Sequence, residues 1–216
     1  VHYNKGDYDK ALEYYVRSLA IREELGDKHG MALSLNSIGI VHRNKGDYDK
    51  ALDYYGRALA IQEELGDKRG MGHGVGNIGI VHSDKGDYDK ALDYYEMSLA
   101  ILQELGDKSG MGIFLGNIGI LHSDKGDYYK VVEYLEKSLA IQKEIGIKEI
   151  ELESTTRLYL AYKYLDKEYD VNEIHALIKE TENIEYHLNL RLYQLLQDTS
   201  FLETAYSQVQ ELADNL

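Results

Sequence analysis

The feature that most constrains this chain is a sequence repeat with a period of 40 residues. Residues 45–84 and 85–124 are identical at 30 of 40 positions, an earlier copy occupies residues 5–44, and a diverging copy begins at residue 125. A regular period of this length is typical of repeat arrays, in which each unit buries its apolar face by stacking on its neighbours. The sequence therefore predicts a solenoid of similar units.

Each repeat contains two segments with helical periodicity. In the copy at 45–84, the first segment follows Gly46 and Asp47, residue types that favour the end of one helix and the start of the next. Its apolar residues recur at spacings of three and four: Tyr48, Ala51, Leu52, Tyr55, Ala58 and Leu59. A second pair, Gly66 and Asp67, precedes the other segment, which continues to residue 85. Each unit is therefore predicted to be an antiparallel helix hairpin.

The pattern resembles the tetratricopeptide repeat (TPR), whose signature is W-x2-L-G-x2-Y in a first helix and A-x3-F in a second helix. The matching residues are Leu35, Ile38, Gly39 and His42 in the first helix, and Ala51, Tyr55 and Ala58 in the second. Two features depart from the family: His replaces the usual Tyr, and the chain contains no Pro. Without a terminal Pro the second helix continues, so the repeat is similar to the long-helix TPRs of kinesin light chains and spindle-orientation adaptors.

The resemblance implies an all-α fold, a right-handed α–α superhelix (TPR solenoid) of antiparallel helix hairpins. It assigns residues 1–169 to the TPR array, with a partial first repeat at 1–25, hairpins at about 28–65, 68–105 and 108–145, and a degenerate repeat from residue 148. Residues 170–216 lack the motif. We expect them to form degenerate helices that cap the array, because a terminal unit needs a polar outer face, and residues 146–216 carry 6 basic and 14 acidic side chains.

The two ends of the sequence indicate a longer parent protein. Residues 1–5 match only the end of a first helix, so we expect the chain to be a fragment with further repeats or another domain upstream. Residues 193–210 resemble segments that follow TPR arrays in microbial signalling proteins, some of which carry a nucleotidyl cyclase or kinase domain. The parent protein is therefore expected to be microbial.

Composition and charge restrict the possible partners and location. The chain has no Cys, which excludes disulfides and thiolate chemistry and is compatible with a reducing, cytoplasmic location. No apolar run approaches the roughly 18 residues that span a bilayer. The formal net charge of −14 disfavours nucleic acid and anionic membranes. We therefore expect a protein or peptide partner that is neutral or basic.

The candidate binding surface lies on the first helix of each hairpin. In TPR-like hairpins these helices line the concave side of the superhelix, and on helix 28–45 the face away from the core repeats at helical spacing. The candidate groove residues in three successive repeats are Asn36, Ser37, Ile40, Arg43, His73, Asn77, Ile80, Asp84, Ile113, Asn117, Ile120 and Asp124. They include an isoleucine row (Ile40, Ile80, Ile120) and a polar row (Ser37, Asn77, Asn117).

The polar row suits recognition of a peptide backbone. An Asn amide both donates and accepts hydrogen bonds, so it pairs with an extended backbone of any sequence. Long-helix TPR relatives use an Asn row in this way, and Asn77 and Asn117 match it, whereas Ser37 departs from it. Gly76 and Gly116 leave room for close approach. The alternative is that the Asn side chains cap local carbonyl groups or face solvent. Only Arg43 supplies positive charge on this face, which argues against the chaperone-binding TPRs that grip a carboxylate with Lys and Arg.

A second recurring feature is a histidine row, His2, His42, His82 and His122. Successive hairpins are separated by about 10 Å, the distance of packed helices, so one His per repeat cannot share a metal ion. We expect these rings to occupy the Tyr position between helices. No nucleotide-binding loop or catalytic constellation is present, and the chain is predicted to have no metal, no cofactor and no enzyme activity.

Two functions remain open from the sequence. The first is a non-catalytic scaffold that binds a peptide segment of a partner in the concave groove. The second is a regulatory or self-association module that packs against an enzyme domain of its parent protein. The incomplete first hairpin also allows the fragment to associate end to end.

Overall fold

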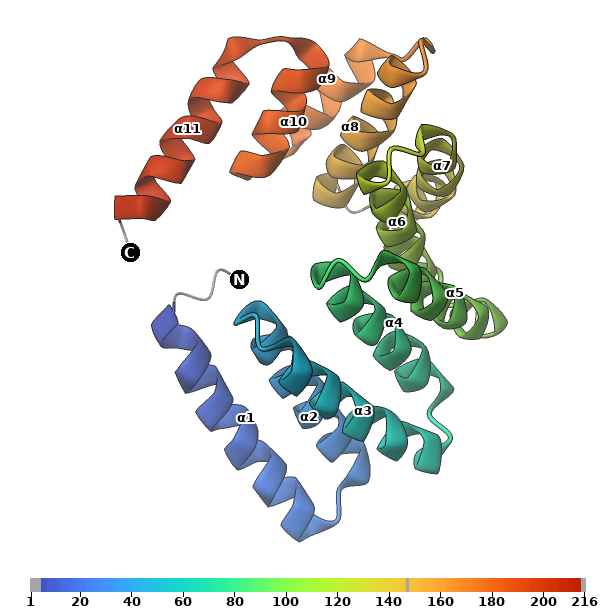
Figure 1. Ribbon diagram of the computed structural model, residues 1–216, viewed down its shortest axis with the longest axis vertical. Coiled ribbons are helices and arrows are strands. Elements are labelled where there is room, and N and C mark those ends of the chain that lie inside the picture. Colours follow the sequence, from blue (N-terminus) through green and yellow to red (C-terminus); the bar gives the residue numbers. More distant parts are fainter. Residues whose placement is uncertain (1–4, 147, 215–216) are drawn as a thin grey trace. The chain divides into compact units, whose positions relative to one another are not determined.

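The computed structural model describes residues 5–146 and 148–214, which form eleven α-helices and no strand (Figure 1). The helices are α1 (Lys5–Leu25), α2 (Lys28–Asn44), α3 (Tyr48–Leu65), α4 (Lys68–Asp84), α5 (Tyr88–Glu104), α6 (Lys108–Asp124), α7 (Tyr128–Ile145), α8 (Lys148–Tyr164), α9 (Val171–Glu180), α10 (Tyr186–Leu196) and α11 (Thr199–Asp214). His2 lies outside the described residues.

The predicted fold class is confirmed: the chain is all-α and built of tandem helix hairpins. The hairpins α2–α3, α4–α5 and α6–α7 occupy the three predicted repeats. Their turns also follow the sequence pattern, because Gly46 and Gly66 adopt the left-handed conformation that favours glycine, with φ of +77° and +66°. After α7 the described residues form α8 to α11, which lack the repeat motif, and α10 begins at Tyr186.

Two compact units divide the chain, one covering residues 1–110 and the other residues 111–216. In the first unit, two clusters form the core between neighbouring helices. One contains Leu19, Leu35, Ile38 and Ala58, and the other contains Ala51, Tyr55, Ile78 and Val81. Each cluster combines residues from three successive helices or from two adjacent hairpins. Stacking, as the repeat predicts, therefore buries the apolar faces.

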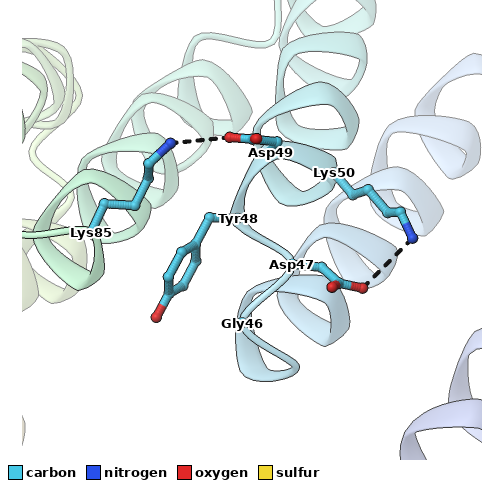
Figure 2. Close-up of a pocket in the computed structure, with 6 residues that line it drawn as sticks. All are labelled: Gly46, Asp47, Tyr48, Asp49, Lys50 and Lys85. Carbon is cyan, nitrogen blue, oxygen red and sulfur yellow. Dashed lines mark hydrogen bonds and ion pairs between the residues drawn. The ribbon is translucent and has the colours of Figure 1, made fainter.

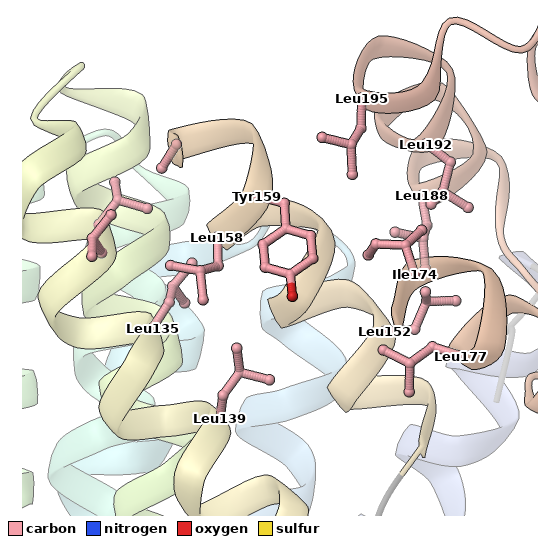
Figure 3. Close-up of a cluster of buried hydrophobic side chains, with 13 residues drawn as sticks. Leu135, Leu139, Leu152, Leu158, Tyr159, Ile174, Leu177, Leu188, Leu192 and Leu195 are labelled. Carbon is pink, nitrogen blue, oxygen red and sulfur yellow. The ribbon is translucent and has the colours of Figure 1, made fainter. Parts of the chain in front are cut away.

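In the second unit, a larger cluster of buried side chains joins α7, α8, α9 and α10 (Figure 3). Leu135 and Leu139 come from α7, Leu152 and Leu158 from α8, and Ile174 from α9. Leu188, Leu192 and Leu195 of α10 complete it. The helices without the repeat motif thus pack on the last regular hairpin and share its core.

The recurring Asp residues of the turns have two different roles. Asp67 caps α4, because its Oδ1 accepts a hydrogen bond from the Gly70 amide at 2.9 Å. Asp47 occupies the corresponding position before α3, but its side chain makes no capping hydrogen bond. Instead, Asp47 Oδ2 lies 3.2 Å from Nδ1 of His42. The sequence predicts the same role for both residues, and the nearby imidazole accounts for the difference.

The histidine row is part of the packing between helices. His42 stacks on Tyr54 with ring centroids 5.4 Å apart, and His82 stacks on Tyr94 at the same distance. His122 stacks on Tyr134 at 5.7 Å, and burial lowers its pKa. These rings therefore occupy the interhelical position that the resemblance predicts for Tyr. None of the described helices is long and apolar enough to cross a membrane.

Candidate functional site

The predicted groove residues of the first unit lie on the solvent-accessible face of α2 and α4. On α2, Ile40 is exposed, while Asn36, Ser37 and Arg43 are partly buried. On α4, Asp84 is exposed, and His73, Asn77 and Ile80 are partly buried. Helical spacing thus separates these side chains from the core residues of the same helices, such as Ile38 and Val81, which are fully buried.

An ion pair joins the two faces. Arg43 Nε of α2 lies 3.4 Å from Asp84 Oδ2 of α4, and both side chains are partly exposed. Burial raises the pKa of Asp84, whereas the charge of Arg43 lowers it. Burial raises the pKa of the two buried tyrosines Tyr55 and Tyr95 to about 12. The charges of Arg43 and Asp84 also act on both hydroxyl groups. The charged end of this face is therefore an electrostatically linked cluster rather than two independent groups.

Three of the predicted residues have local partners or constraints. Ser37 donates a hydrogen bond to the Leu33 carbonyl oxygen of its own helix at 3.0 Å. His73 turns towards Asp107, with Nε2 3.4 Å from Oδ2, and Arg69 pairs with the same carboxylate at 3.0 Å. The side-chain oxygen of Asn36 is buried and has no hydrogen-bond partner among the described residues. His73 is thus linked to the turn before α6.

In the second unit, α6 presents the third copy of the face. Ile113 is 46% exposed, and Asn117 and Ile120 are partly buried. Gly116 has a different role from the expected one, because it is buried and a Cβ atom there would lie 3.3 Å from Ser138 Oγ of α7. Its missing side chain serves the packing of α6 on α7. Gly76 of α4 is also buried.

The face continues on α8, where the sequence analysis assigned no site. Counting 40 residues onward from Asn117, Ile120 and Asp124 gives Arg157, Leu160 and Tyr164. These residues line a cavity of about 140 Å³, together with Ala161 of α8, Ser123 of α6, Tyr128 of α7, and Arg191 and Gln194 of α10. The 40-residue period would have identified Arg157, whereas no repeat pattern predicts Arg191.

Two arginines in this cavity share one carboxylate. Arg157 donates to Glu153 Oε1 from Nη2 at 2.9 Å and from Nε at 3.3 Å. Arg191 Nη1 lies 3.8 Å from the same oxygen. The Arg157 side chain is only 13% exposed and that of Arg191 27%. Burial, together with the nearby Arg157, lowers the pKa of Arg191.

A family model described as tetratricopeptide repeat matches residues 1–64 and 74–144. The chain belongs to the tetratricopeptide-repeat family. No curated protein matches it in sequence. The first helices α2, α4 and α6 of this TPR chain therefore correspond to the helices that carry the W-x2-L-G-x2-Y signature of the family.

Several solved structures share the TPR fold at low sequence identity. BtubC (BKLC) from P. vanneervenii is 15% identical over 96% of this chain and 91% of its own, with a TM-score of 0.71. A putative kinesin light chain from Podosopora anserina with nearly identical TPR-like repeats is 18% identical over 88% of this chain and 89% of its own, with a TM-score of 0.57. NprR in complex with its cognate peptide NprX is 21% identical over 96% of this chain and 65% of its own, with a TM-score of 0.67.

The turns of the TPR array form a second depression, of about 400 Å³, lined by Gly46, Asp47, Tyr48, Asp49, Lys50 and Lys85 (Figure 2). Its charged side chains pair with one another, because Lys85 Nζ lies 3.0 Å from Asp49 Oδ1 and Lys50 Nζ lies 3.7 Å from Asp47 Oδ2. Lys45 and Asp9 make the same contact one repeat earlier, at 2.6 Å. The Lys85–Asp49 and Lys45–Asp9 pairs connect successive repeats, so the depression is part of the stacking.

No cluster of three or more potential metal-ligating side chains occurs among the residues that the structure describes. His42, His82 and His122 each stack on a Tyr ring of the second helix of the same hairpin. The accessible face of the first helices and the arginine cavity are therefore the surfaces that carry the functional argument.

Proposed function

We propose that this TPR chain is a non-catalytic interaction scaffold that binds a peptide segment of a partner protein along the accessible face of its first helices. The observation that carries the proposal is a repeated surface that stays accessible to solvent. The isoleucine row and the two asparagines of the polar row recur at 40-residue spacing and stay accessible at each copy, while neighbouring positions are buried.

The chemistry of this face matches an extended peptide. The asparagines offer one donor and one acceptor each for backbone amides, and the isoleucines offer apolar contacts for side chains. NprR, which shares the fold, is seen in complex with a peptide. Hydrogen bonds contribute about 0.5–1.5 kcal/mol each, so two Asn amides account for roughly a tenfold to hundredfold difference in affinity.

Calorimetry with a library of end-capped heptapeptides, basic and apolar, tests the proposal. The peptide affinity of the double variant Asn77→Ala, Asn117→Ala is expected to be lower by about tenfold or more. The matched control is Asn172→Ala, which removes the same amide from an exposed position on α9. Unchanged binding by the double variant, or equal loss in the control, would remove the groove from consideration.

A second candidate, a self-association or regulatory module, is favoured by apolar side chains on the terminal helices. On α1, Tyr14 and Leu25 are more than 70% exposed, and on α11 Tyr206 and Leu212 are more than half exposed. Surfaces of this kind mark protein contacts. Light scattering over a hundredfold concentration range separates the candidates, because a constant monomer mass argues against self-association. We also propose that residues 170–216 cap the TPR array.

A further inference from the structure

We propose that the cavity lined by Arg157 and Arg191 binds a carboxylate of the partner peptide. This inference deepens the proposed function, on which it rests for the nature of the ligand as a peptide. It assigns the site to α8 and α10, beyond the three repeats that carry the predicted groove residues. The overall charge of −14 does not describe the local chemistry of this cavity, where two arginines lie beside one carboxylate.

Positive charge exceeds negative charge among the side chains in contact at this cavity. Two guanidinium groups face one carboxylate, and both approach the same oxygen, Glu153 Oε1. Asp124, which lies on the exposed end of α6, adds a weaker field at Arg191. The group of three side chains in contact thus carries one positive charge in excess, in a partly buried place where water screens charge poorly. One additional carboxylate would balance it.

Arg191 uses little of its hydrogen-bonding capacity. A guanidinium has five N–H donors. Among the described residues, the hydrogen-bond acceptor of Arg191 is the His187 carbonyl oxygen at 3.5 Å, and Glu153 lies beyond hydrogen-bond distance at 3.8 Å. The Arg191 side chain is 27% exposed, so its remaining N–H donors are accessible to a ligand. Arg191 therefore lies beside Arg157, is partly buried, and retains donors to which a bound carboxylate could accept hydrogen bonds.

The walls of the cavity combine aromatic, polar and apolar side chains. Tyr128 and Tyr164 stack with ring centroids 4.4 Å apart, which gives one side a rigid aromatic wall. Ser123 and Gln194 add polar groups at the edge, and Leu160 and Ala161 give an apolar floor. A volume of about 140 Å³ fits a carboxylate with a short stem. A phosphate dianion fits less well, because a second negative charge would meet Glu153 without compensation.

The position of the cavity connects it to the proposed groove. Arg157 follows Asn117 by 40 residues and therefore continues the polar row, and Leu160 continues the isoleucine row in the same way. Ser123 of α6, which precedes the groove residue Asp124, lines the cavity. A peptide that uses Asn117 for its backbone would thus reach Arg157 with a carboxylate from an acidic side chain or from its C-terminus.

The test uses small probes and arginine side-chain NMR signals of the 15N-labelled chain. N-acetylglycine represents a C-terminal carboxylate, N-acetyl-aspartyl amide represents an acidic side chain, and N-acetylglycinamide is the uncharged control. We expect saturable shifts of the Nε–Hε signals of Arg157 and Arg191 with one or both carboxylates and none with the amide. The stronger of the two carboxylates identifies the source. Saturation by the amide, no response to either carboxylate, or tighter binding of inorganic phosphate would overturn the proposal.

Two variants distinguish binding from a structural role of the arginines. Arg191→Gln removes the excess charge and is expected to weaken carboxylate binding about tenfold or more. Glu153→Gln removes the competing carboxylate and is expected to strengthen binding by a similar factor, a gain that a folding defect cannot produce. Arg57→Gln, on an exposed arginine of α3, is the matched control without effect. Weaker carboxylate binding by Glu153→Gln would show that the three side chains only hold α10 to α8.

Peptide binding in the groove and carboxylate binding at the arginines can be measured separately, so either can fail alone. Heptapeptides that bind through Asn117 with equal affinity as acids and as amides would retain the groove and remove the arginine site. Binding of the carboxylate probes without any peptide binding would retain the arginine site and remove the groove.

Discussion

The hairpin α4–α5 of the first unit and the pair α8–α9 of the second use the same sequence position in opposite ways. In α4–α5 a glycine of the first helix receives an aromatic ring of the second, because a Cβ on Gly79 would lie 2.8 Å from the Tyr95 ring. Forty residues after Gly119, α8 carries Tyr159. Its ring is buried, and its hydroxyl bonds to Glu173 of the short helix α9.

This difference shows how helix packing changes between the regular hairpins and the α8–α9 pair. A glycine opposite a ring lets two long helices approach closely along their length. A ring on the first helix instead holds the second helix at a polar contact, and a cavity of about 330 Å³ lies beside Tyr159, Tyr162 and Glu173. The regular hairpins are thus tightly packed, and the α8–α9 pair leaves open space beside its ring.

The largest effect is expected from removing the rings. Tyr95→Ala should lower the free energy of unfolding by about 3–5 kcal/mol, because it empties a fully packed place. Tyr159→Ala should cost clearly less, because its ring borders an open cavity that water can fill. Urea denaturation followed by circular dichroism measures both, and Tyr14→Ala, at a 72% exposed ring, is the control. Equal losses for Tyr95 and Tyr159 would break the comparison.

The glycine side of the contact gives the next effect. Gly79→Ala should destabilise by about 1–3 kcal/mol, because the rigid, buried Tyr95 ring cannot move away. Gly119→Ala should cost less, since its Cβ would meet Leu135 Cδ2, the end of a flexible side chain. Gly56→Ala is the control, because nothing lies within 4 Å, and it should stabilise α3 by about 0.5–1 kcal/mol. A loss of stability in Gly56→Ala, measured by the same urea titrations, would contradict this account.

A smaller effect distinguishes the two nearly identical repeats of the first unit. The Tyr95 hydroxyl is hydrogen-bonded to Ser83, whereas the Tyr55 hydroxyl is buried without a partner among the described residues. The position of Ser83 is occupied one repeat earlier by Arg43, which extends to Asp84 instead. Tyr95→Phe should therefore cost about 0.5–1.5 kcal/mol, and Tyr55→Phe should be neutral or stabilising. Thermal denaturation of the two variants at neutral pH measures both effects. A larger loss of stability in Tyr55→Phe than in Tyr95→Phe would refute this prediction.

The smallest effect on stability comes from titration of these tyrosines. It is absent near neutral pH and grows at alkaline pH. Burial raises the pKa of Tyr55 and Tyr95 to about 12 in the folded protein, above the value of about 10 of an unfolded chain. Their contribution to stability is therefore complete below pH 10 and is lost as the pH rises from about 10 to 12. Melting temperatures measured across that range should fall less steeply for Tyr55→Phe. A parallel decrease in both proteins would show that Tyr55 does not contribute.

Much of the candidate site could be predicted from the repeat, but its partners could not. The period identified the accessible face with Ile40, Ile80 and Ile120, because helical spacing fixes which side chains share one side of a helix. It could not show that His73 turns towards Asp107 or that Gly116 packs against Ser138. Those contacts depend on which side chain of a neighbouring helix stands opposite.

The sequence by itself determined the local structure of this protein: the hairpins, the left-handed glycine turns, and the place of the histidines between helices. These follow from short-range preferences and from a period that every repeat shares. Only the tertiary structure decided that Asp47 pairs with His42 instead of capping α3. It alone brought Arg191 of α10 beside Arg157 of α8. The reason is physical: α10 lies outside the repeat, so its partner is set by packing on α8 and not by any periodic pattern.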